Sequence, residues 1–178
     1  MDSINKQQEE KNQEDLFAKA AIAKIREIVD KNSTCFFNTK VASNEKVCSR
    51  PMTVQKVDVQ GDLLFLSASD SHKNKHIQEA QTVQLLFQGS QYADFLSIFG
   101  EASISTDKAL IQELWTPLLK TWFTEGVEDP RITVIRVKPT EGYYWDNKHG
   151  NAVAFIKTAI GAIIGKTMDD SIEGHLWT

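Results

Sequence analysis

The stretch 47–55, Val-Cys-Ser-Arg-Pro-Met-Thr-Val-Gln, places a proline in the middle of a β-rich run. Proline has no backbone N–H to donate to a ladder, so in sheets it is confined to edge strands, strand starts and bulges. The sequence therefore predicts a strand whose hydrogen bonding is interrupted at Pro51. The backbone donors around Arg50 and Met52 are then available to something other than a neighbouring strand.

Periodicity and turn residues place the other elements around this strand. Strands are expected at 34–41, 46–59, 63–67, 83–88, 95–105, 132–137 and 142–145. Helices are expected at 15–32, 76–81, 107–115, 116–123 and 152–164. The first three strands are expected to form an antiparallel meander with a hairpin loop at 42–45, and the last two to pair around Pro139. About seven strands with short helices predict a mainly β fold, a barrel-like antiparallel sheet with peripheral helices.

The length of 178 residues fits one compact domain. Residues 1–14 are polar and are expected to form a disordered tail. Residues 15–147 are expected to form the barrel domain, and residues 148–178 a C-terminal helix and tail that pack on the barrel or on a dimer partner. The pattern within 166–178 is ambiguous. A barrel of this size leaves apolar strand faces uncovered, so we expect a twofold homodimer.

Charge and hydropathy exclude several classes of partner. The net charge of -4 and the pI of about 5.6 give no basic face for nucleic acid. Residues 1–15 lack the apolar core of a secretory signal, and the two cysteines show neither metal-binding nor disulfide-framework spacing. The apolar run 152–164 is interrupted by Lys157 and is too short to span a bilayer. We therefore expect a cytoplasmic protein with no nucleic-acid or membrane partner.

Common catalytic and nucleotide-binding motifs are absent. The sequence has no phosphate loop, no Gly-x-Gly-x-x-Gly, no His-Glu-x-x-His and no Gly-x-Ser-x-Gly. His72 and His76 lie four residues apart without a third ligand nearby, so we interpret them as surface residues and expect no metal site. No side chain stands out as an obligate acid or base, and no catalytic residue is assigned.

The segment 67–75, Ser-Ala-Ser-Asp-Ser-His-Lys-Asn-Lys, lies where a strand gives way to a helix. Hydroxyl groups, Lys73 and the free N–H groups of a helix N-terminus would suit a phosphate monoester. Arg50 in the neighbouring predicted strand would add bidentate recognition of the phosphate. The alternative is that the serines and the aspartate only cap the helix while the lysines are solvated.

Taken together, several stretches resemble the general stress protein branch of the pyridoxamine 5′-phosphate oxidase-like family, which has the FMN-binding split barrel fold. They are Ser49–Met52, Phe65–Lys73, Val83–Phe87, Ser97–Ala102, Glu113–Pro117, Trp122–Phe123, Asp129–Pro130 and Tyr143–Trp145. The ordered set, running from about residue 15 to residue 147, carries the resemblance. It implies an antiparallel Greek-key split barrel that forms a homodimer with two flavin sites at the interface.

The resemblance also implies a cofactor site for FMN, with FAD as an alternative. The implied flavin-binding residues are Arg50, Pro51, Met52, Thr53, Ser67, Ser71, His72, Lys73 and Trp145. Arg50 matches an arginine on the ribityl-phosphate side, residues 51–53 match the strand along the isoalloxazine ring, and residues 67–73 fall on the phosphate-binding turn. Trp145 matches an aromatic residue that approaches the flavin from the other subunit. Phe95 stands where the oxidases have a polar flavin contact.

Two departures from the oxidases limit the function that the resemblance implies. Gln55 stands where the oxidases have a lysine for the substrate phosphate, and Asp146–Gly150 replaces an arginine and histidine pair. We therefore expect no oxidation of pyridoxamine phosphate. The leading interpretation is a low-specificity flavin-dependent oxidoreductase with NADH, NADPH or a small molecule as electron partner. The alternatives are a non-catalytic module that binds or sequesters flavin, and an interaction domain with an empty site.

Overall fold

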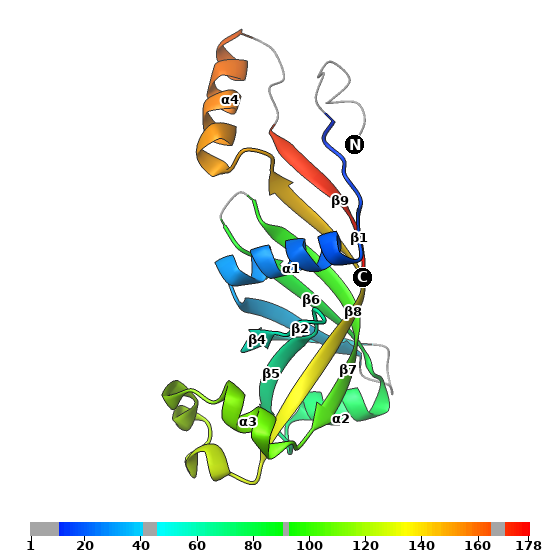
Figure 1. Cartoon of the computed structure of the whole chain (residues 1–178), viewed down its shortest axis with the longest axis vertical. Coiled ribbons are helices and arrows are strands. Elements are labelled where there is room, and N and C mark those ends of the chain that lie inside the picture. Colours follow the sequence, from blue (N-terminus) through cyan, green and yellow to red (C-terminus); the bar gives the residue numbers. More distant parts are fainter. Residues whose placement is uncertain (1–10, 41–45, 91–92, 165–169) are drawn as a thin grey trace.

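The computed structural model describes residues 11–40, 46–90, 93–164 and 170–178, which form a nine-stranded sheet with helices around it (Figure 1). The strands are β1 (Leu16–Phe17), β2 (Thr34–Lys40), β3 (Val47–Thr53), β4 (Lys56–Val57), β5 (Leu63–Ala68), β6 (Thr82–Gln88), β7 (Phe95–Ser105), β8 (Ile132–Asn147) and β9 (Ser171–Trp177). The α-helices are α1 (Lys19–Lys31), α2 (His72–Glu79), α3 (Lys108–Leu114) and α4 (Asn151–Ile164). Two 3₁₀ helices, η1 (Pro117–Thr121) and η2 (Gly126–Glu128), follow α3.

The sheet is mixed and is not closed. Its strand order is β1-β9-β8-β7-β6-β2-β3, and β5 pairs with β4 and with the first half of β8. Every strand pair is antiparallel except β1 with β9. The expectation of a mainly β fold is confirmed, and the order places the proline-containing strand β3 at one end of the sheet.

The inner face of the sheet carries the core because alternate residues of its strands point toward α1. Phe37, Leu85 and Ile98 are fully buried and come from three successive strands. Helix α1 lies across these strands (Figure 1) and buries Ile25 and Ile28 against them. Replacing such a side chain by alanine in a packed core lowers the free energy of unfolding by about 2–5 kcal/mol. This face therefore fixes the register of the sheet.

The opposite face, which we call the outer face, exposes apolar side chains. The strand register aligns Pro51, Phe36, Leu86, Ser97 and Tyr143 in one row across five strands. The exposed apolar residues of this face include Phe36 (58%), Leu86 (39%), Phe99 (41%), Trp145 (42%) and Trp177 (42%). Exposed apolar side chains gathered on one face of a sheet are typical of an interaction site.

The N-terminal segment 12–17, which we call the strap, runs along β9. Glu14 N donates to Glu173 O (2.9 Å), Glu173 N donates to Asn12 O (2.9 Å), and the Tyr144 hydroxyl donates to Glu14 O (2.9 Å). A Cβ atom on Gly174 would lie 1.9 Å from Glu14 O, so only glycine allows this approach. Of the tail expected to be disordered over 1–14, residues 1–10 lie outside the described residues and residues 12–14 are instead hydrogen-bonded to the sheet.

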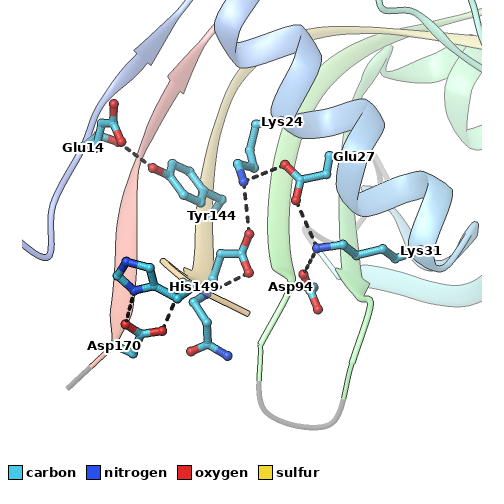
Figure 2. Close-up of polar contacts among 10 residues, drawn as sticks. Glu14, Lys24, Glu27, Lys31, Asp94, Tyr144, His149 and Asp170 are labelled. Carbon is cyan, nitrogen blue, oxygen red and sulfur yellow. Dashed lines mark hydrogen bonds and ion pairs between the residues drawn. The ribbon is translucent and has the colours of Figure 1, made fainter. Parts of the chain in front are cut away.

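Charged side chains join α1 to the far ends of β7 and β8 (Figure 2). Lys24 Nζ contacts Asp146 Oδ2 at 3.0 Å, Lys31 Nζ contacts Asp94 Oδ1 at 2.5 Å, and Glu27 bridges the two lysines. Lys157 of α4 contacts the buried Asp170 at 2.7 Å. Helix α4 otherwise stands away from the sheet (Figure 1), while β9 pairs with β8, so the segment 148–178 contributes both a projecting helix and a sheet strand.

The expected meander of 34–41, 46–59 and 63–67 is present in part, because β2 pairs with β3 and β4 pairs with β5, both antiparallel. The expected middle strand 46–59 is instead two strands, β3 and β4, and β5 also pairs with β8. Two further expectations are wrong. Residues 132–147 form one strand, not a pair, because a register shift at Phe99/Gly100 accommodates Pro139 opposite Gly100. Helix α1 begins at Lys19, not at residue 15, because Leu16 and Phe17 pair with β9. The expected hairpin loop 42–45 lies outside the described residues.

Candidate functional site

Strand β3 is the edge on which the candidate site is built. Its ladder partner is β2, where Pro51 lies opposite Phe36 and Arg50 opposite Phe37. An edge strand is one of the places where a proline is tolerated, and the register between β2 and β3 runs through Pro51 without a shift instead of being interrupted there. Side chains alternate along this strand, so Pro51 and Thr53 point to the outer face while Arg50 and Met52 point inward, where Met52 packs against the main core.

Arg50 is half-buried and held by two hydrogen bonds. Its Nη1 donates to Thr39 Oγ1 (3.0 Å) and its Nη2 donates to the carbonyl oxygen of Cys48 (3.0 Å). A guanidinium has five N–H donors in a fixed plane, so three remain after these contacts. Arg50 is therefore fixed in place with donors left for an anion.

Lys73 brings a second positive charge to Arg50 from the first turn of α2. Burial lowers the pKa of Lys73 most, the charge of Arg50 lowers it further, and Asp70 opposes both effects. The charges of Lys73 and Arg50 therefore interact, and we call these two residues the cationic pair. Two cations near enough for their charges to repel each other suit the binding of a phosphate group.

Ser67 and Ser71 lie at the N-terminus of α2 in a buried polar network. Ser67 Oγ donates to Asn74 Oδ1 (2.6 Å), and Asn74 Nδ2 donates to Thr133 Oγ1 (2.9 Å). Thr133 Oγ1 in turn donates to the carbonyl oxygen of Ser67 (2.9 Å). Ser71 is the N-cap of α2 and accepts from Asn74 N. Ser71 therefore caps α2, as the capping alternative predicts, while Ser67 bonds to Asn74 behind the cap and Lys73 is half-buried, not fully solvated. His72 is exposed.

A mostly apolar pocket of about 360 Å³ opens beside Pro51 on the outer face. Its lining residues are Asn32, Thr34, Cys35, Phe36, Pro51, Leu86, Phe87, Gln88 and Phe95. The volume lies at the lower end of the range for small-molecule sites. Burial raises the pKa of Cys35 to about 12, so its thiol stays protonated at neutral pH. The pocket offers a flat ligand an apolar surface without an ionised group among these residues.

Trp145 lies on the outer face but not beside Arg50. Strands β7, β6 and β2 separate its strand from β3, and its ring contacts Tyr143 with centroids 4.7 Å apart. Within one chain the structure therefore brings together Arg50 and Lys73, and places Trp145 elsewhere. In the part of the chain that the structure describes, no three His, Cys, Asp or Glu residues cluster as metal ligands. No helix among the described residues has the length and hydropathy to cross a membrane.

The sequence analysis missed Thr39 and His76. Thr39 Oγ1 lies 2.9 Å from His76 Nδ1, and Thr39 is 1% exposed. One feature of the sequence points to Thr39, because it is a polar residue at the inward position that Cys35 and Phe37 share in the same strand. His76, interpreted as a surface residue, is instead half-buried against this hydroxyl.

Known proteins are similar to this chain in sequence and in fold. The family model for pyridoxamine 5′-phosphate oxidase like proteins matches residues 20–169. The chain belongs to this family. Protein bli-3 of Neurospora crassa is 31% identical to this chain over 144 residues, which cover 76% of this chain and 69% of that protein.

Solved structures share the fold of this pyridoxamine 5′-phosphate oxidase-like chain. A candidate general stress protein 26 from Jannaschia sp. CCS1 aligns with a TM-score of 0.73 at 18% identity, covering 88% of this chain and 97% of that one. The general stress FMN/FAD binding protein of Xanthomonas citri aligns with a TM-score of 0.55 at 22% identity, covering 68% and 84%. The family expected from the sequence is confirmed, and general stress proteins are among its structural neighbours.

Proposed function

We propose that this chain binds a flavin, FMN in preference to FAD, as a split barrel of antiparallel Greek-key type whose homodimer places a site at each interface. The cationic pair at the edge of β3 carries the proposal, since Arg50 is held with free donors and Lys73 adds a second charge. The apolar pocket beside Pro51 opens on the outer face, so a flavin whose phosphate meets the inward-pointing Arg50 would pass around the edge of β3 to place its ring system there. The flavin in the name of the Xanthomonas citri neighbour supports this choice of ligand.

We propose further that the protein is a low-specificity flavin-dependent oxidoreductase and not a pyridoxamine phosphate oxidase. A bound flavin would supply the redox chemistry. The chain would supply Arg50 and Lys73 for the phosphate, β3 for the ring, and Trp145 from the partner subunit. Gln55 is half-buried and donates to the carbonyl oxygen of Thr53 (3.2 Å), so it offers no charge where the oxidases have a lysine.

A non-catalytic flavin-binding module is the second candidate. The pocket favours it in one respect, because none of the residues that line it is an acid or a base at neutral pH. Reduction of the bound flavin by NADH or NADPH, followed by stopped-flow absorbance, separates the two functions. Rapid hydride transfer supports an oxidoreductase, and a flavin that stays oxidised supports a carrier. Conversion of pyridoxamine phosphate by the FMN-loaded protein would contradict the proposal that it is not an oxidase of that substrate.

The first test of the site is the affinity for FMN, measured by quenching of flavin fluorescence. We expect R50A and K73A each to weaken FMN binding about 10- to 100-fold, because hydrogen bonds to charged groups contribute about 1.5–3 kcal/mol. Lys75→Ala is the matched control, since Lys75 is exposed on the same helix at a position that does not share the face of Lys73. Colourless protein that ignores added FMN would exclude flavin binding altogether.

A further inference from the structure

The candidate phosphate site has a second layer built from Thr39 on β2 and His76 on α2. Thr39 Oγ1 lies 3.0 Å from Arg50 Nη1 and 2.9 Å from His76 Nδ1, so the three side chains form a chain of hydrogen bonds. Thr39 is 1% exposed, which leaves water no access to its hydroxyl. These hydrogen bonds link β2, β3 and α2 at Arg50.

The direction of both hydrogen bonds follows from the groups involved. A guanidinium only donates, so Thr39 Oγ1 accepts from Arg50. The hydroxyl hydrogen of Thr39 is then free to donate, and His76 Nδ1 is its partner at 2.9 Å. The reverse arrangement, in which His76 donates, would leave this buried hydroxyl hydrogen without an acceptor, which costs free energy. In this arrangement Nδ1 of His76 is the acceptor, and the ring N–H is on Nε2.

We propose that Thr39 and His76 are positioning residues that hold the Arg50 guanidinium for the phosphate of the ligand, an inference that rests on the proposed flavin site. An arginine side chain loses conformational entropy when it is immobilised on a ligand. Thr39 Oγ1 and the carbonyl oxygen of Cys48 hold the guanidinium from two sides before any ligand arrives. His76 in turn fixes the orientation of the Thr39 hydroxyl.

Affinities for FMN and riboflavin, which differ by the phosphate, test this role. We expect Thr39→Val to weaken FMN binding about 3- to 10-fold, since a typical hydrogen bond contributes about 0.5–1.5 kcal/mol, and to leave riboflavin binding unchanged. Thr39→Ser keeps the hydroxyl and should restore the affinity for FMN. His76→Leu removes the acceptor and should reproduce the selective loss. A general weakening of the fold would reduce the binding of both flavins alike.

The outcomes separate this inference from the proposed function. If the wild-type protein binds neither flavin, the proposed function fails and the inference fails with it. If the wild-type protein prefers FMN and Thr39→Val keeps the full preference, the positioning role alone is wrong. The ¹⁵N chemical shifts of the His76 ring in the wild-type protein give a readout that needs no variant. A proton on Nδ1 at neutral pH would overturn the hydrogen-bond chain.

Discussion

Lys73 holds its charge in an environment that disfavours it. Burial and the neighbouring Arg50 both lower the pKa of the ammonium group from its usual 10.5, and Asp70 offsets part of this. Between the folded-state pKa and 10.5 the unfolded chain binds more protons than the folded one, so this group makes stability rise with pH in that window. A bound phosphate would raise the pKa of Lys73 again, because its negative charge stabilises the protonated ammonium group.

We therefore predict that FMN affinity falls as pH rises through a value below 10.5, the point at which Lys73 loses its proton. Fluorescence titrations at several alkaline pH values measure the midpoint. Lys73→Arg keeps the charge throughout this range, because arginine stays protonated, and should remove the dependence. A midpoint that is the same in the wild-type protein and in Lys73→Arg would contradict the assignment of Lys73 to the site.

Asp129 gives a prediction at the opposite end of the pH scale. Hydrogen bonds from the Arg131 side chain lower the pKa of the Asp129 carboxyl to about 2, outweighing desolvation, and the Arg131 backbone N–H lowers it further. Its contribution to stability is complete above 3.8, the ordinary pKa of an aspartate, and is lost as pH falls toward about 2.

We expect Asp129→Asn to lower the urea midpoint at neutral pH and to flatten the loss of stability between pH 3.8 and about 2. Asp30→Asn, at an exposed position of α1, is the control and should leave both properties unchanged. If the wild-type protein and Asp129→Asn lose the same stability as the pH falls through this range, the Asp129 carboxylate is not a source of acid sensitivity.

At the scale of elements, Gly174 decides whether the strap can lie on β9. We predict that Gly174→Ala displaces the strap, because its Cβ would lie 1.9 Å from Glu14 O, and that the amide of Glu14 then exchanges its hydrogen faster. Hydrogen exchange followed by mass spectrometry reports this segment directly. Glu173→Ala changes the neighbouring side chain without adding a Cβ atom and should leave the exchange rate unchanged. Unaltered exchange in Gly174→Ala would contradict the close packing of the strap.

Elements with strong local patterns could be predicted from the sequence. The period of two in residues 95–105 identifies β7, and Asp107 caps α3 through Ala109 N and Leu110 N as its residue type suggests. The strap, β9 and the undivided β8 could not be predicted, because each depends on a pairing between distant segments. Pro139 reads locally as a break, and only the register shift opposite it in β7 makes the strand continuous.

The residues of the candidate site that are unusual in their local sequence could be predicted, and those that only packing brings to the site could not. Arg50 and Pro51 stand out because neither suits the middle of a strand, and Lys73 stands out beside a helix N-terminus. Thr39 and His76 could not be grouped with them, because only the packing of α2 against β2 brings the two together. Hydroxyl residues such as Ser67 suit phosphate binding and helix capping equally well in sequence, and its buried hydrogen bonds serve the cap.

For the whole molecule, the outer face is the surface through which we expect a second copy to bind. Its exposed aromatic and aliphatic side chains suit an isologous interface, in which the same surface of each subunit meets. Such an interface would also bring Trp145 of the partner subunit toward the edge strand β3, from which Trp145 of the same chain is separated by three strands. Dimerisation and flavin binding are then linked, because each site needs both subunits.

We predict that Phe99→Glu, which places a charge on the outer face, prevents formation of the proposed dimer and weakens FMN binding. Phe99 is 41% exposed and does not line the pocket, so the fold and the pocket should persist. Val59→Glu is the control at an 86% exposed position away from this face. Sedimentation velocity gives the mass of each variant. A wild-type protein that sediments as a monomer would exclude this mode of assembly.

The strap also constrains the order in which the chain can fold. The register of β1 and β9 pairs Leu16 with Leu176, so nearly the whole chain lies between the two partners. Contacts between such distant residues form slowly, because the loop between them must close first. Until β9 arrives, residues 141–147 of β8 present an open edge to other chains. We therefore expect the newly made protein to be most prone to aggregation just before this last pairing completes the sheet.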